Sequence, residues 1–168
     1  MSFNFTPTDT DTSVKVPFFE DARADFAPYY SSRQDGWTIK RAQAAVSEEM
    51  GKLKGGVVAF REGVFSDKGQ RYGYQIDFVM EGATGRLNIA GLPIRSNLTP
   101  KKIESVRIQA LLNMRDWLKT AITSMVFSPG NNPLIPHLLG PGGRTMAEFI
   151  AERASLDMPL LVGEIVEG

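Results

Sequence analysis

The chain contains no cysteine among its 168 residues. Disulfides, thiolate nucleophiles and cysteine-based zinc sites are therefore excluded, and a reducing compartment such as the cytoplasm is expected. The single histidine, His137, excludes a metal site built from several histidines. Its neighbours Pro136 and Leu138 are typical of a packed or surface histidine rather than a catalytic one. No apolar run approaches the roughly 18 residues of a membrane span, and no signal-peptide pattern is present, so no membrane partner is predicted.

Motifs of common active sites are also missing. Gly140–Thr145 (GPGGRT) superficially resembles a phosphate-binding loop, but it lacks the required spacing and the lysine, so an ordinary connecting turn is expected. Three carboxylates on the predicted strands, Glu62, Asp77 and Glu81, could in principle hold a magnesium ion. The E-x-K tripeptide of a restriction-type nuclease does not accompany them. We therefore predict no catalytic residues, no metal site and no cofactor, in a protein that is not an enzyme.

The centre of the chain has the pattern of an antiparallel β-meander. Residues Val57–Phe65, Tyr72–Met80 and Arg86–Ile94 are β-rich segments separated by turn sequences. Period-two alternation in the middle segment places its large apolar side chains on one face. These side chains are Tyr72, Tyr74, Ile76, Phe78 and Met80. We therefore predict a sheet with one apolar face and one polar face.

Two amphipathic helices flank the predicted sheet. Thr38 has the position of an N-cap for a helix to about Lys54, and Thr99-Pro100 begins a second helix that continues to Val126. At about 1.5 Å per residue the second helix would be about 40 Å long, so one end should pack on something other than the sheet. The expected fold class is α+β, with a three-stranded antiparallel meander packed by helices in α-β-β-β-α order.

We expect one core domain with an extension at each end. Residues 1–15 are rich in Thr, Asp and Ser with little periodicity, which predicts a disordered segment. Residues 16–127 form the predicted core domain, in which the apolar Val16–Phe19 stretch pins the early chain to the core or to a partner subunit. Residues 128–168 comprise a Pro/Gly-rich arm, a short helix and a tail. The helix should open with a capping box made by Thr145 and Glu148.

The arm combines helix-breaking residues with apolar ones. Four prolines and four glycines occur in the 16 residues from Ser128 to Gly143. This composition excludes regular structure over most of the arm. Four large apolar side chains nevertheless lie within it, namely Leu134, Ile135, Leu138 and Leu139. Such an arm is either functional or reaches another subunit, and with the long helix it predicts a homo-oligomer.

Charge is distributed unevenly although the net charge is zero. Residues 1–36 carry 3 basic and 6 acidic side chains (3 − 6 = −3), residues 37–127 carry 14 and 8 (+6), and residues 128–168 carry 2 and 5 (−3). A basic body between acidic ends raises the hypothesis of nucleic-acid binding. The alternative is that the acidic flanks dock onto the basic body and neutralise it.

Six basic residues are the candidate nucleic-acid contacts: Lys40, Arg41, Lys68, Arg71, Lys101 and Lys102. They lie at the start of the first helix, around the first hairpin and at the start of the second helix. In order and placement this is similar to the double-stranded RNA-binding domain, which contacts RNA through its first helix, its first inter-strand loop and a lysine pair opening its last helix. The resemblance is topological and covers about Trp37 to Val126. The predicted last helix is longer than that of the family.

Two functions are therefore predicted. The first is a nucleic-acid-associated binding protein without catalysis, with Lys101 and Lys102 best placed to meet a phosphate at a helix N-terminus. The same lysines could instead pair with an acidic flank such as Asp9 or Asp11. The alternative function is a structural or assembly protein that oligomerises through its long helix and apolar C-terminal arm.

Overall fold

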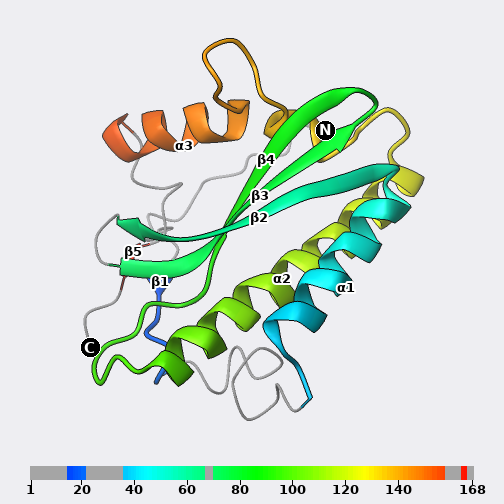
Figure 1. The fold of residues 1–168 in the computed structure, drawn as a ribbon. Coiled ribbons are helices and arrows are strands. Elements are labelled where there is room, and N and C mark those ends of the chain that lie inside the picture. Colours follow the sequence, from blue (N-terminus) through cyan, green and yellow to red (C-terminus); the bar gives the residue numbers. More distant parts are fainter. Residues whose placement is uncertain (1–14, 22–35, 67–69, 158–163, 166–168) are drawn as a thin grey trace, which may run out of the picture.

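The computed structural model describes residues 15–21, 36–66, 70–157 and 164–165. Its centre is a three-stranded antiparallel sheet of β2 (Gly55–Ser66), β3 (Gln70–Met80) and β4 (Ala83–Ala90), in the order β2-β3-β4. Helix α1 (Ile39–Lys52) precedes the sheet and α2 (Pro100–Phe127) follows it (Figure 1). The predicted α+β class and its α-β-β-β-α order are confirmed.

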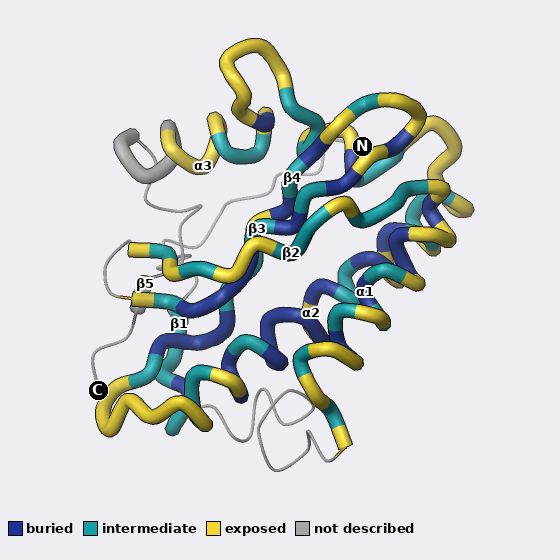
Figure 2. The backbone as a smooth tube through the Cα atoms, in the orientation of Figure 1, coloured by how far each residue is buried: buried dark blue, intermediate teal, exposed yellow. Residues whose placement is uncertain are grey.

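The predicted faces of the sheet are also observed. The alternate side chains Tyr72, Tyr74, Ile76, Phe78 and Met80 of β3 are all buried. Their neighbours in the sheet continue the same face, because Phe60 of β2 and Leu87 of β4 both lie opposite Ile76. Helices α1 and α2 cover this face side by side, with their buried surfaces turned to the sheet (Figures 1 and 2).

Local signals fix the helix ends. The Thr38 hydroxyl accepts a hydrogen bond from the Arg41 amide at 3.1 Å, and the Thr99 hydroxyl accepts one from the Lys102 amide at 3.2 Å. Proline at the first position of α2 loses no hydrogen bond there, because the first N–H groups of a helix have no intrahelical partner. Lys54 adopts a φ of 60° where α1 gives way to β2. Both helices therefore begin at the predicted N-caps.

The third strand differs from its predicted range. It occupies Ala83–Ala90 rather than Arg86–Ile94. The chain leaves the sheet at Gly91, where an added Cβ would lie 2.1 Å from the carbonyl oxygen of Val106 in α2. The next residue, Leu92, donates its backbone N–H to Gln109 Oε1 at 2.8 Å. Close approach to α2, which a local sequence pattern does not report, therefore ends the strand.

The extra length of α2 is used at its N-terminal end. Val106 packs there in a small buried cluster with Phe19, Tyr72 and Leu92, beyond the main core between the helices and the sheet. The expectation that Val16–Phe19 pins the early chain agrees with this cluster. This end of α2 packs on Phe19 and Leu92, which lie outside the sheet, as well as on Tyr72 of β3. Residues 1–14 lie outside the described residues, so the disorder predicted for them stays a prediction.

The arm after α2 returns to the outer edge of β4. Leu134 is fully buried in the main core, and Leu138 packs against the same core. Leu138 forms an isolated antiparallel bridge with Gly85, and the Leu139 amide donates to the Thr84 carbonyl at 2.9 Å. A single 3₁₀ turn, η3 (Ile135–His137), lies between these anchors. The arm is therefore held by its own chain at several points.

Two further elements complete the described structure. Helix α3 (Met146–Asp157) follows the arm and lies across the sheet from α1 and α2 (Figure 1). A short parallel pair joins β1 (Lys15–Val16) to β5 (Glu164–Ile165), so the apolar C-terminal tail contributes a strand.

Candidate interaction surfaces

Arg71, one of the predicted nucleic-acid contacts, makes hydrogen bonds to the backbone of its own chain. Its Nε donates to the carbonyl oxygen of Gly91 at 3.1 Å and its Nη2 approaches that of Ala90 at 3.4 Å. Burial lowers the pKa of the Arg71 guanidinium from its usual value. The side chain closes the end of β4 where the chain leaves the sheet, and its donors point toward backbone carbonyls.

Arg41 is engaged at the start of α1. It donates to the Gly36 carbonyl at 2.9 Å and lies over the Trp37 ring at 4.1 Å from the centroid. Arg115 of α2 contacts the same ring at 5.3 Å. Because both arginines contact this ring, the start of α1 lies beside Arg115. Arg115 is 14 residues along α2 from Lys101, or about 20 Å along the helix axis. The structure therefore does not bring Lys40 and Arg41, at the start of α1, close to Lys101 and Lys102, at the start of α2.

Lys102 contacts an acidic residue of the N-terminal flank. Its ammonium group lies 3.1 Å from Glu20 Oε1 and 2.9 Å from the Ser96 carbonyl. Next to it, Arg95 pairs with Asp21, and the Arg95 amide donates to Glu20 Oε2 at 3.1 Å. Burial acts to raise the pKa of the Glu20 carboxyl, but the hydrogen bonds from the Arg95 amide and Lys102 lower it overall. Of the two predicted lysines at the start of α2, Lys102 is therefore bound by an acidic residue of its own chain.

The other predicted contacts are less constrained. Lys40 and Lys101 are exposed in the first turns of α1 and α2, and within the described residues neither makes a recorded ion pair or hydrogen bond. Lys68 lies outside the described residues. The sequence-level alternative of acidic flanks docking on the basic body is realised three times, in the pairs Lys102–Glu20, Arg95–Asp21 and Arg86–Glu148.

Glu148 fastens α3 to the polar face of the sheet. Its two carboxylate oxygens accept hydrogen bonds from Arg86 Nε and Nη2 at 2.9 and 2.8 Å, and Oε2 also accepts one from Asn88 at 2.8 Å. The predicted capping box is present, because Thr145 Oγ1 accepts from the Glu148 amide and Glu148 Oε1 accepts from the Thr145 amide, both at 3.0 Å. These bonds, led by those from Arg86, lower the pKa of Glu148 to about 2.

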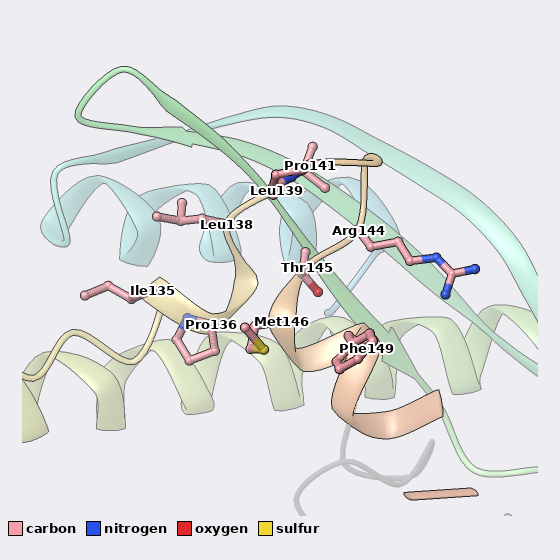
Figure 3. Close-up of a pocket in the computed structure, with 10 residues that line it drawn as sticks. Ile135, Pro136, Leu138, Leu139, Pro141, Arg144, Thr145, Met146 and Phe149 are labelled. Atoms are coloured by element: carbon pink, nitrogen blue, oxygen red, sulfur yellow. The ribbon is translucent and has the colours of Figure 1, made fainter. Parts of the chain in front are cut away.

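The apolar side chains at the start of α3 are turned away from that anchor. Met146, Phe149 and Ile150 are 58, 47 and 49% exposed. Met146 and Phe149 line a groove of about 650 Å³ between the arm and the helix, shown in Figure 3. Its lining is mainly apolar and comprises Ile135, Pro136, Leu138, Leu139, Gly140, Pro141, Arg144, Thr145, Met146 and Phe149. The groove, together with Ile150, is called the apolar face below.

The rim of the apolar face carries both charge signs. Arg144 at its edge, just before α3, forms an ion pair with Glu152 in the second turn of that helix, and both side chains are 59% exposed. The wall opposite α3 is held in place by the bridge between Leu139 and Thr145 and by the buried Leu134. The groove is therefore formed before any partner arrives.

The carboxylates considered for a magnesium site do not lie together. Glu62 accepts a hydrogen bond from the Tyr74 hydroxyl on the helix-covered face of the sheet. Asp77 pairs with Arg61 on the opposite face. Within the described residues, no three histidine or acidic side chains gather as a metal site would require. Burial lowers the pKa of His137, whose ring meets Trp117 edge-on at 5.5 Å between centroids.

In the described part of the chain, no helix has the length and apolar character needed to cross a membrane. Comparison with known proteins finds no matching family model, no matching curated protein and no matching solved structure.

Proposed function

We propose that this protein is a binding and assembly module whose working surface is the apolar face. The occupant is a protein segment with an apolar ridge that fills the groove and charged residues that meet its rim. The observation that carries the proposal is the orientation of α3. The helix lies on the sheet through the carboxylate of Glu148 while Met146, Phe149 and Ile150 remain about half exposed.

This orientation leaves hydrophobic stabilisation unused in the isolated chain. Burying a large apolar side chain completely is worth roughly 1.5–3 kcal/mol, so three that are half exposed retain several kcal/mol for a partner. Scattered apolar residues on a surface need no explanation, but a contiguous apolar patch beside a groove is typical of an interaction site. Among the residues that the structure describes, four of the ten exposed large hydrophobic side chains, including Ile135, belong to this one surface.

The groove also has the rigidity that favours binding. Leu134 and the Gly85–Leu138 bridge fix one wall, and the Thr145–Glu148 capping box fixes the first turn of the other. A site that is already ordered loses less conformational entropy when a partner binds. This supports a role for the arm as a preformed receptor.

Site-specific photo-crosslinking tests the proposal. Benzoylphenylalanine would replace Met146 in the full chain, and in a matched control it would replace Val58, which is 64% exposed on β2. Irradiation in the cells that make the protein should yield, at position 146 alone, an adduct with one protein species identified by mass spectrometry. Equal or absent adducts at the two positions would contradict the proposal.

A second candidate function is nucleic-acid binding through Lys40 and Lys101. The specific observation is that both are exposed in the first turn of a helix, where unpaired backbone N–H groups favour a phosphate. The double change Lys40→Ala with Lys101→Ala should then weaken binding to all sequences and reduce the salt slope by up to about two units. Lys119→Ala, at an exposed position further along α2, is the control. Absence of salt-sensitive binding by the unmodified chain would reject this function.

A further inference from the structure

We infer that the occupant of the apolar face is a second copy of this chain, docked through the same surface on both copies. This inference rests on the proposed function, to which it adds the identity of the partner. Three properties of the surface support it: its shape, its rim charges and the overall charge of the chain.

The apolar face holds both exposed apolar side chains and a groove. Ile150, which is half exposed, lies one helical turn beyond Met146, and Met146 lines the groove between α3 and the arm. A two-fold interface places the same patch of one copy on that of the other, so it requires a ridge and a groove within one patch. Here the exposed Met146 and Ile150 side chains of each copy would enter the groove of its partner.

The rim charges suit the same arrangement. Arg144 and Glu152 are exposed beside the groove and pair with each other in the single chain. Across a two-fold axis, Arg144 of one copy can meet Glu152 of the other without bringing like charges together. The net charge of zero means that long-range repulsion does not oppose association of two copies.

Sedimentation equilibrium of the full chain tests this inference. The unmodified protein should form a dimer whose dissociation constant rises at least tenfold on Met146→Glu, because the new carboxylate would be buried in an apolar groove. Val58→Glu introduces the same charge at a similarly exposed apolar position on β2 and should leave the dimer unchanged. Circular dichroism of both variants checks that the fold is retained.

A charge exchange identifies the rim contact. Arg144→Glu and Glu152→Arg should each weaken the dimer, and an equimolar mixture of the two single variants should restore association, because opposite charges then face each other only between copies. A monomer at every concentration, or a dimer indifferent to Met146→Glu, would overturn the inference. If the chain is monomeric and position 146 still crosslinks to a different protein, the identification of the partner as a second copy is wrong. The proposed function would then remain.

Discussion

Helices α2 and α3 contact the rest of the chain in opposite ways. In α2 the apolar side chains Leu111 and Leu118 are fully buried against the core. In the described part of α3 the contact with the sheet is a carboxylate, Glu148, and apolar side chains such as Phe149 are about half exposed. Helix α2 is stabilised by burial of its apolar stripe. Helix α3 is held by hydrogen bonds that leave its apolar side chains exposed.

The comparison separates two roles that a helical apolar pattern can have. An apolar stripe normally indicates which side of a helix faces its own core. A strong polar anchor on another side of the helix reverses that expectation and leaves apolar side chains exposed, as in α3.

Two phenylalanine-to-alanine changes provide the sharpest contrast. Phe78→Ala, at a fully buried position of β3, should lower the free energy of unfolding by roughly 3–5 kcal/mol because it leaves a cavity in the core. Phe149→Ala on α3 should cost less than about 1 kcal/mol, since the ring is already half exposed. Urea unfolding of dilute protein measures both. Equal losses would show that α3 is a core helix like α2.

Glu148→Gln should loosen α3 and spare the sheet. The change removes the charge from hydrogen bonds to Arg86 and Asn88, a loss of about 1–2 kcal/mol for a partly buried, charge-assisted contact. Amides of α3 should therefore exchange with solvent about tenfold faster in hydrogen-exchange experiments, while those of β3 keep their rates. Faster exchange throughout the molecule would mean that Glu148 supports the whole fold.

Acid should have the same local effect. The folded pKa of Glu148 is about 2, below its ordinary value of 4.5, so its contribution is complete above pH 4.5 and is lost as pH falls from there toward 2. The Thr145 amide, which donates to Glu148 at 3.0 Å, reports this titration by NMR. Its chemical shift should titrate with a midpoint near 2. A midpoint near 4.5 would contradict the ion pair.

Lys102→Ala should have the smallest effect. The Lys102–Glu20 pair is partly exposed, and pairs of this kind contribute about 0.2–1 kcal/mol. Thermal unfolding at low and high salt should show a small loss that salt reduces. A loss of several kcal/mol would indicate that docking of the N-terminal flank is a major source of stability.

The sequence predicted those parts of the fold whose signals are local. Alternation identified the buried face of β3, the threonine caps located the starts of α1 and α2, and Thr145 with Glu148 gave the capping box. Each depends on residues a few positions apart. Their physical causes therefore operate within one element and can be recognised without a tertiary structure.

What the sequence did not predict depends on distant contacts. Arg86 and Glu148 are separated by 62 residues, and no local pattern relates them. Gly91 ends β4 early because α2 crosses it closely, and the arm's return to Gly85 depends on an edge that only the folded sheet provides. The predicted pairing of Lys102 with an acidic flank had the right chemistry, but its partner is Glu20. Asp9 and Asp11 lie outside the described residues.

Hydrogen exchange of the unmodified chain at low and high protein concentration tests the central claim most directly. If the apolar face is an interface between two copies, amides from Ile135 to Ile150 should gain protection as concentration rises. Amides of β3, already protected in the core, should keep theirs. Protection that is independent of concentration along the whole chain would contradict the account.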